Sequence, residues 1–532
     1  MTDARGPVDD PDVCVIGAGP AGALVAYTLA SRGHRVVVLE AGDRFDRSED
    51  EIRMERSLRP AHDAGEVWNM EQGDGRDAYT SSGERGYPLN AARVKGVGGS
   101  TLHWQGMVMR MHEKDFEMRT RHGVGRDWPL SYEDLRPYYA RAERELGVAG
   151  TDDNPYAPPR EEPFPLPAFE PSYSDALFAD ACEEVGVEMH SVPNARNSEP
   201  YDDRGACVGY GTCQPVCPSG AKYTADVHAR KAEEEGATVI DLAQVERLET
   251  DSTGDGVEAA VYTTPRNTHR QSADVFVIAC GGVETPRLLL LSRSREHPDG
   301  LANSSGAVGR YFTEHLFAGA GGTVEDRTRQ NHVGFITSES HALYDGDEPT
   351  PLGTKLEFFN YAGPSPAIEA MNADDWGDGL LEDLRGSYGN NIAMGGLVEQ
   401  IPDAENRVAL DETTTDNLGN PVPDVRWSVG ERTAEAIRAA NGVQHDVLKA
   451  MDADIGWTVG PPDTGPAYHH MCTTRMGHHD DETVVDARTK AHDLDNLYIA
   501  SSSVFVTAGA MNPTLTIAAL ALRTADHIDE EL

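Results

Sequence analysis

The chain of 532 residues contains no apolar run as long as the roughly 18 residues that a membrane-spanning helix needs. Its first twelve residues also lack the basic start and the apolar stretch of a secretory signal peptide. From these two absences we expect a protein that has no direct membrane span, does not direct its own export, and is cytoplasmic by its own sequence.

Positive charge is scarce as well. The chain has 7 lysines against 39 arginines, and its formal net charge is −43. Such a surface repels nucleic acid and anionic lipid, so we expect no nucleic-acid partner. The acidic residues are dispersed along the chain instead of forming one tail. This pattern favours a halophilic protein, because salt screens the self-repulsion of its charges, although an ordinary acidic enzyme is the alternative.

Cysteine is rare, and the seven present are too few for a disulfide scaffold in a chain of this length. Three of them, Cys207, Cys213 and Cys217, lie close together on a loop rich in glycine and proline. Thiolates at this spacing can converge on one metal centre, whereas disulfides would leave one cysteine over. Zinc normally takes a fourth ligand, and the nearest histidine, His228, lies eleven residues further on. Three reduced structural thiols are the alternative.

A dinucleotide-binding pattern opens the chain. An apolar segment at 12–17, a glycine turn, a helical segment from Pro20 to Arg32 and a second apolar segment at 34–42 predict a βαβ unit. The turn fits G-x-G-x-x-G, in which glycines let the backbone approach a pyrophosphate held at the helix N-terminus. An acid at the end of the second strand can accept hydrogen bonds from the ribose hydroxyls. The predicted contacts are Gly17, Gly19, Pro20, Ala21, Gly22 and Glu40, and they fit FAD and NAD equally well.

The remaining pattern predicts two domains. A helix opened by Ser131 is expected at 129–147, and the prolines between Pro155 and Pro171 indicate an extended connection. Alternating segments joined by DNLGNPVP predict an antiparallel sheet, and the chain closes with a strand and a long helix. We expect an α/β fold with a discontinuous Rossmann-like nucleotide-binding domain and an antiparallel-sheet α+β substrate domain. The expected ranges are 11–150, 200–317 and 463–532 for the first domain, 151–199 for a connecting segment, and 318–462 for the second domain.

The segment YHHMCTTRMG at 468–477, followed by NLYIASSSVFVTAGAMNPTLTIAALALRTADHI, resembles the closing signature of the glucose-methanol-choline (GMC) oxidoreductases. Similar matches occur at 96–104, 279–292 and 308–315, and in the segments ENRVALD and DNLGNPVP, so the resemblance covers nearly the whole chain. It implies a Rossmann-like FAD-binding domain and an enzyme that oxidises a CH–OH group by hydride transfer to flavin N5.

The resemblance also implies the site residues. The family places a His and a second His or Asn beside the flavin, and these map onto His469 and Asn512. His469 is the candidate base, since hydride leaves an alcohol carbon readily only as the hydroxyl proton is removed, and Asn512 holds the substrate oxygen. A surface role for His469 and a helix-capping role for Asn512 are the alternatives. The chain departs from the family at His470, often proline, and at Cys472, usually glycine. Further implied cofactor contacts are Gly98, Gly99, Ser100, His103, Ser501, Asn512, Pro513 and Thr514.

The closest similarity is to the sugar and gluconate dehydrogenase branch of the family. In the matching loop of that branch, a His before the Trp can be bonded covalently to flavin, and His103 fits that position; packing beside the flavin ring is the alternative. The spacing of Cys207, Cys213 and Cys217 is similar to that in catalytic subunits of this branch that hold a three-iron cluster. This similarity implies a 3Fe-4S cluster that passes electrons to an external acceptor.

The same branch implies a sugar, sugar acid or polyol as substrate. Its dehydrogenases commonly work with a small subunit and a cytochrome, and the small subunit can carry the export signal for both, so a cell-surface location requires such a companion. Three alternatives stay open: a flavin-binding electron-transfer subunit without alcohol oxidation, an oxygen-using GMC oxidase, and a nicotinamide-dependent oxidoreductase. The last of these leaves the C-terminal signature unexplained.

Overall fold

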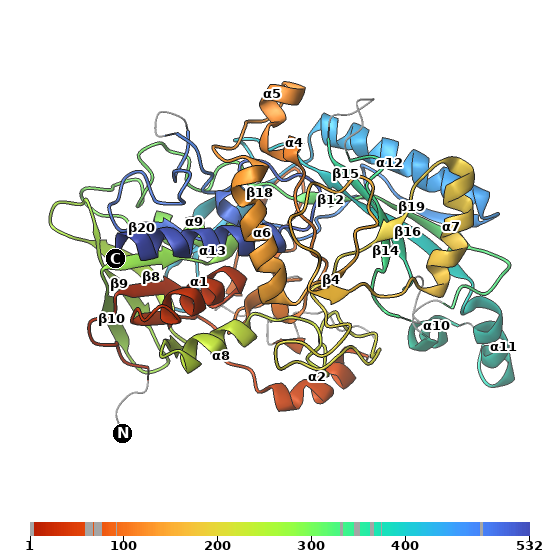
Figure 1. Ribbon diagram of the computed structural model, residues 1–532, viewed down its shortest axis with the longest axis horizontal. Coiled ribbons are helices and arrows are strands. Elements are labelled where there is room, and N and C mark those ends of the chain that lie inside the picture. The colour runs from red at the N-terminus through yellow and green to blue at the C-terminus, as the bar shows by residue number, and fades with distance from the viewer. Residues whose placement is uncertain are drawn as a thin grey trace.

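The structure is a computed structural model that describes residues 5–58, 67–68, 77–91, 93–329, 333–344, 352–361, 366–373, 375–478 and 482–532. Its elements form two halves, one built on a parallel sheet and the other on an antiparallel sheet (Figure 1). The predicted fold class, an α/β protein with a second part built on an antiparallel sheet, is confirmed.

The parallel sheet has five strands in the order β20-β11-β1-β2-β7. Strands β1 (VCVI) and β11 (VFVI) are buried along their whole length, as expected for a parallel sheet covered on both faces. Helix α1 packs against α13 and α8, and α13 packs against α6 (Figure 1). The bounds are β1 Val13–Ile16, β2 Val36–Leu39, β7 Thr238–Ile240, β11 Val275–Ile278, β20 Leu497–Ile499, α1 Pro20–Ala30, α6 Tyr132–Leu146, α8 Asp226–Glu234 and α13 Thr514–Glu531. The sheet is therefore assembled from segments far apart in the sequence, as a discontinuous domain requires.

The antiparallel sheet has the order β19-β13-β16-β15-β14-β6, with β12 also pairing with β16. Helices α7 and α12 pack on each other and on this sheet, in the right half of Figure 1. The bounds are β6 His190–Ser191, β12 His315–Phe317, β13 Gly319–Thr323, β14 Ser338–Ser340, β15 Thr354–Phe359, β16 Asn391–Glu399, β19 Asp454–Val459, α7 Tyr173–Val185 and α12 Glu431–Ala450.

The segment 151–199 has more structure than a connection. The proline-rich stretch ends at Pro171, and Ser172 then opens α7 with a capping box in which its side chain accepts a hydrogen bond from the backbone N–H of Asp175. Strand β6 follows and pairs with β14. This segment therefore contributes a helix and an edge strand to the antiparallel half, a difference from the expected boundary.

The other elements agree with the sequence pattern. Ser131 caps α6 through a capping box. Strand β17 ends just before DNLGNPVP, β18 begins at Pro421 within it, and the two form an antiparallel pair. None of the helices in the described ranges is long and apolar enough to cross a bilayer. The remaining bounds are α2 Asp50–Ser57, α4 Glu113–Phe116, α5 Met118–His122, α9 Gly281–Leu291, α10 Pro366–Asn372, α11 Asp378–Ser387, β3 Thr80–Gly83, β4 Ala149–Gly150, β5 Leu166–Pro167, β8 Gln244–Thr250, β9 Val257–Thr263, β10 Thr268–Ser272, β17 Arg407–Thr415 and β18 Pro421–Trp427.

Most lysines point inward. Lys114, Lys222 and Lys355 are buried, and only Lys449 on α12 has a largely exposed side chain, at 66%. A buried ammonium is costly unless it is paired or hydrogen-bonded, so the interior lysines are expected to have specific polar partners. The positive charge of the surface is consequently supplied almost entirely by arginine.

Candidate active site

A cavity of about 530 Å³ is lined by residues from both halves of the molecule. This size is within the range of small-molecule and cofactor sites. The predicted site residues that line it are Gly17, Gly19, Pro20, Glu40, Gly99, Ser100, His103, His469, Asn512, Pro513 and Thr514. The structure therefore brings the dinucleotide turn, the second glycine loop and the C-terminal signature to one cavity.

The three glycines of the first turn have different roles. Gly17 has a φ of +102°, and a Cβ there would lie 2.7 Å from the Ala279 carbonyl oxygen. A Cβ on Gly22 would lie 2.0 Å from the Gly17 oxygen, so both positions are closed by backbone packing. Gly19 differs, because a Cβ there would meet no described atom within 4 Å, and Gly19 faces the cavity. This open backbone at the start of α1 fits the close approach of a pyrophosphate.

Glu40 stabilises the same turn through hydrogen bonds from the backbone. Its Oε2 accepts a hydrogen bond from the backbone N–H of Ala18 at 2.8 Å, and its Oε1 accepts one from Gly42 at 2.9 Å. Burial raises its pKa, which these backbone N–H groups oppose. A carboxylate has about four acceptor sites, so Glu40 keeps acceptor capacity at the cavity wall for ribose hydroxyls.

The second glycine loop packs directly on the first. The backbone N–H of Gly98 donates to the Ala18 oxygen at 2.9 Å, and a Cβ on Gly99 would lie 2.9 Å from the Cα of Gly19. His103 ends the short helical turn that follows and is 5% exposed at the cavity wall. This arrangement places His103 at the cavity wall, next to the dinucleotide turn.

Four predicted contacts do not line the cavity: Ala21, Gly22, Gly98 and Ser501. Ser501 instead caps a short turn, because its Oγ accepts from the backbone N–H of Ser503 at 3.1 Å. The next residue, Ser502, lines the cavity, and its hydroxyl donates to the His470 carbonyl at 2.6 Å. In this turn it is therefore Ser502, and not Ser501, that lines the cavity.

His469 is held by a second histidine that sequence analysis gave no role. His315 Nδ1 lies 2.9 Å from His469 Nδ1, and His315 Nε2 lies 3.2 Å from the Ala508 carbonyl oxygen. A carbonyl only accepts, so His315 carries its proton on Nε2 and presents a lone pair at Nδ1. His469 must then donate from its own Nδ1, and its Nε2 is left with a lone pair.

Both imidazoles are neutral in this arrangement. Burial lowers the pKa of His315 to about 4. Burial, followed by the neighbouring His315, Lys355 and His470, holds the pKa of His469 well below its ordinary value. A neutral imidazole with a free lone pair is the form that a general base requires.

Asn512 is anchored by a buried lysine. Lys355 Nζ donates to Asn512 Oδ1 at 2.7 Å, and it also lies 2.8 Å from Glu357 Oε1. Lys355 is fully buried on β15. The sequence signal for this role is weak: a lysine, a rare residue here, lies two residues before a glutamate in the strand TKLEFF. The orientation of Asn512 is therefore set from the antiparallel half.

His470 points to a different group, the buried carboxyl of Glu314. His470 Nε2 lies 3.7 Å from Glu314 Oε1, which also receives a short hydrogen bond from the Tyr87 hydroxyl. Glu314 Oε2 accepts from the backbone N–H of His469 at 2.9 Å. Burial raises the pKa of Glu314 to about 8, and burial lowers the pKa of His470 to about 3.

We expect Glu314→Gln to flatten the pH dependence of thermal stability. The folded protein keeps the Glu314 carboxyl protonated up to about pH 8, whereas its ordinary pKa is 4.5. Between these values the unfolded chain binds fewer protons, so the stability of the native protein decreases as pH rises. Glutamine mimics the protonated acid and removes that contribution. Melting temperatures of both proteins, measured from about pH 5 to pH 8, should diverge with rising pH; parallel curves would contradict the assignment.

The cysteine loop lies beside the cavity. Cys213 and Cys217 are buried and Cys207 is partly buried, and Gln214 of the same loop lines the cavity wall. Within the described residues, these thiols do not form a group whose ligand atoms all lie within 4.8 Å of one another, which a single ion requires. A polynuclear cluster holds its thiolates further apart than a single ion does, because each thiolate binds a different iron.

Two buried cations face this loop. Lys222 Nζ donates to the Cys213 carbonyl at 2.6 Å and to the Trp104 carbonyl at 2.7 Å. Arg196 is fully buried and donates to the Gln105 carbonyl at 2.9 Å, and its Nε and Nη1 have no hydrogen-bond partner among the described residues. Burial alone would raise the pKa of Cys217, yet Ser219, Lys222 and Arg196 together lower it. This environment suits an anionic thiolate cluster.

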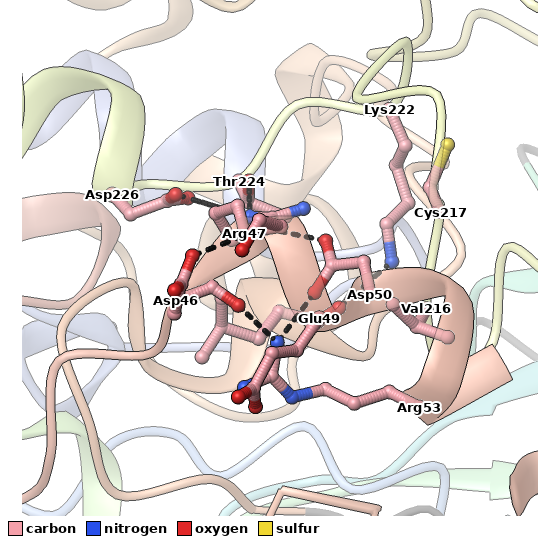
Figure 2. Close-up of polar contacts among 12 residues, drawn as sticks. Asp46, Arg47, Glu49, Asp50, Arg53, Val216, Cys217, Lys222, Thr224 and Asp226 are labelled. Atoms are coloured by element: carbon pink, nitrogen blue, oxygen red, sulfur yellow. Dashed lines mark hydrogen bonds and ion pairs between the residues drawn. The ribbon is translucent and has the colours of Figure 1, made fainter.

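Figure 2 shows a network of ion pairs next to the cysteine loop. Lys222 and Cys217 lie beside the network of Arg47 and Arg53. Arg47 lies 2.6 Å from Asp50 Oδ2 and 3.0 Å from Asp226 Oδ2. This network links α2 to the start of α8, and Lys222 then connects the cysteine loop to the backbone on either side of His103.

The sequence matches models of the GMC oxidoreductase family over residues 85–317 and 402–521, and a model of an NAD(P)-binding Rossmann-like domain over residues 15–59. The chain is 34% identical to the fructose dehydrogenase large subunit of Gluconobacter japonicus, with 98% of each protein covered. It is 30% identical to 2-methyl-1,2-propanediol dehydrogenase of Mycolicibacterium austroafricanum, with 98% of this chain and 95% of that protein covered.

The fold is similar to that of a formate oxidase of Aspergillus oryzae, with a TM-score of 0.69 at 16% identity and 98% of each chain covered. The glycine turn lies within the matched segment 15–59, and the C-terminal segment with His469 and Asn512 lies within the matched segment 402–521. The chain belongs to the GMC oxidoreductase family and is an FAD-dependent oxidoreductase.

Proposed function

We propose that this protein is a dehydrogenase that oxidises a CH–OH group of a sugar, sugar acid or polyol and passes the electrons through an iron–sulfur cluster to an external acceptor. The observation that carries the proposal is the His315–His469 pair at the cavity wall, which leaves the lone pair of His469 Nε2 available for a hydroxyl proton. The dehydrogenases of sugar and diol named above are the relatives that support the substrate class.

FAD, when bound, accepts the hydride from the substrate carbon. Gly19 and the start of α1, positioned by the turn at Gly17, would hold its pyrophosphate, and Glu40 would hold its ribose. His469 Nε2 takes the hydroxyl proton, and His315 keeps the His469 ring in the orientation and tautomer that this step needs. Asn512, fixed by Lys355, orients the substrate oxygen.

Cys207, Cys213 and Cys217 would hold a 3Fe-4S cluster, whose chemistry is the acceptance and release of single electrons. Two hydrogen-bond connections support transfer between the two redox sites. Lys222 bonds both loops, and the Gln105 amide donates to the Gln214 side chain at 3.1 Å. The cysteine loop therefore contacts the second glycine loop directly, at Trp104 and the adjacent Gln105.

Three further assignments are part of the proposal. His103 contacts the flavin and is the candidate for a covalent bond to it. A small subunit and a cytochrome are the expected partners, as the large-subunit name of the fructose dehydrogenase relative suggests for that protein, and they would set a cell-surface location. The dispersed acidic surface and the inward lysines support operation at high salt.

Anaerobic mixing of the holoenzyme with hexoses, sugar acids and polyols tests the proposal. We expect at least one of these compounds to bleach the flavin absorbance. If a chemical reductant bleaches the flavin but no CH–OH compound does, the protein is an electron-transfer subunit. If the reduced enzyme reoxidises in oxygen as fast as with one-electron acceptors, it is an oxidase.

A further inference from the structure

Three buried side chains gather at the edge of the antiparallel sheet, outside the cofactor cavity. His190, Glu339 and His341 are 4%, 0% and 2% exposed. Their ligand atoms all lie within 4.8 Å of one another, and no other group of three His, Cys, Asp or Glu side chains in the described chain is so close. None of the three lines the cofactor cavity, so its chemistry does not account for them.

Strand pairing brings these residues together. His190 on β6 and Glu339 on β14 are directly opposite each other in the antiparallel register, so their side chains lie on the same face. His341 follows Glu339 by two residues, which in an extended chain returns to that face. The pairing of β6 with β14 therefore places two histidines and a carboxylate on one face of the sheet.

His190 is already in the form of a metal ligand. Its Nδ1 lies 3.1 Å from the Ser191 carbonyl oxygen, which only accepts, so Nδ1 carries the proton and Nε2 carries the lone pair. Nε2 is buried and has no hydrogen-bond partner among the described residues. A backbone carbonyl bonded to one ring nitrogen is the usual way of orienting the other toward a metal.

His341 has a partner that permits either tautomer. Its Nε2 lies 3.1 Å from Glu339 Oε1, and its Nδ1 lies 3.0 Å from Asn154 Nδ2. The Asn154 amide offers a donor and an acceptor, so a half-turn of that amide allows Nδ1 to donate and frees Nε2 for an ion. The 3.1 Å separation is close to the roughly 3.4 Å between two ligands of a tetrahedral zinc ion with bonds near 2.1 Å.

Charge and space also suit a cation. Lys355 lies 3.4 Å from Glu339 Oε2 but 2.8 Å from Glu357 Oε1, so a second carboxylate neutralises the lysine. Asp153 adds negative charge close to His190, because its carboxylate accepts a hydrogen bond from the hydroxyl of the next residue, Ser191, at 2.7 Å. A cavity of about 40 Å³, lined in part by His341, Ser191 and Asn154, adjoins the group. This volume holds a water molecule, which can supply a fourth ligand.

We propose that His190, Glu339 and His341 bind one divalent metal ion of the zinc type, with a water from the adjoining cavity as fourth ligand, and that this ion fastens β6 to β14. Two imidazoles and one carboxylate form a donor set that zinc accepts. None of its ligands lines the cofactor cavity, so none is expected to contact the cofactor or the substrate. Glu339 is shared with Lys355, which connects the site to Asn512.

Zinc binding by the holoenzyme tests this site. After treatment with a chelator, titration with Zn²⁺ alone should show one ion per chain and a higher melting temperature, because an ion that binds only the native state stabilises it. His190→Gln and His341→Gln should each weaken binding by about 100-fold or more, since even residues behind a ligand contribute 10–100-fold. His445→Gln is the matched control, because His445 lies on α12 and contacts Thr458.

X-ray absorption at the zinc edge separates this site from the cysteine loop. We expect only nitrogen and oxygen neighbours near 2.0 Å, whereas zinc held by thiolates would show sulfur near 2.3 Å. Sulfur neighbours, a wild type that binds no zinc at micromolar concentration, or unchanged affinity in both histidine variants would each overturn the proposal. These readouts do not use catalysis, so a failure here is distinct from a failure of the proposed function.

Discussion

His469→Ala is expected to slow the reduction of bound flavin by substrate by about 10²–10⁴-fold, the usual effect of removing a general base. The variant loses the Nε2 lone pair that the contact with His315 leaves available. FAD binding should be retained, because the pyrophosphate site at Gly17 and Gly19 is formed by a different part of the chain. Anaerobic stopped-flow spectroscopy of the flavin band measures the rate, and the absorbance ratio of flavin to protein measures the cofactor content.

Two further variants, Asn512→Ala and His470→Ala, test whether His469 is the base. Asn512→Ala should have a smaller effect, because it removes orientation and one hydrogen bond but leaves the base in place. His470→Ala should also slow flavin reduction less than His469→Ala does, since the His470 side chain points to Glu314. If His470→Ala abolished reduction while His469→Ala reacted at nearly the native rate, the base would be assigned to the wrong one of the two histidines.

Cys213→Ser is expected to lower the iron content from about three atoms per chain to near zero while FAD stays bound. Reduction of the flavin by substrate should continue, whereas electron delivery to one-electron acceptors should decrease, because the two redox sites use different residues. Iron and sulfide analysis of anaerobically purified protein measures the first effect, and rapid mixing with an acceptor measures the second.

Cys182→Ala is the matched control for this experiment. Cys182 is buried on α7, away from the three-cysteine loop, so its removal should leave iron and acceptor reactivity unchanged. Zinc in place of iron, or wild-type protein without metal, would exclude the cluster. Normal acceptor kinetics in an iron-free Cys213→Ser protein would show that electrons leave the flavin by another route.

The parts of the site that follow from local sequence were predictable. A glycine with φ of +102° at Gly17, a second glycine packed on its oxygen at Gly22, and an acid after the second strand are requirements of one short βαβ unit. The same holds for the capped helix after Ser131, because a capping box is formed by residues three positions apart. Family resemblance added His469 and Asn512, and both lie at the cavity wall.

The partners of these two residues could not be predicted, because they come from distant strands. His315 precedes His469 by 154 residues and Lys355 precedes Asn512 by 157 residues, so only the pairing of sheets brings them together. In the turn after β20, Ser502 lines the cavity and Ser501 caps the turn, a distinction that the motif alone does not specify. Strand β6 was missed because two residues carry almost no periodicity.

The inward position of the lysines has a practical consequence for attaching this enzyme to a surface. Amine-reactive reagents modify exposed lysine side chains in their neutral amine form, which burial of the side chain makes inaccessible. Lys231 and Lys490 are mostly covered and lie 2.7 Å and 2.8 Å from Asp202 and Glu531. Lys449 on α12 is 66% exposed and lies 3.5 Å from Asp446, so it is the lysine side chain most open to modification. Coupling to an activated carboxylate electrode at low reagent ratio should therefore tether the protein mainly through α12, which covers the antiparallel sheet (Figure 1). The immobilised molecules would share one orientation, a condition for uniform current.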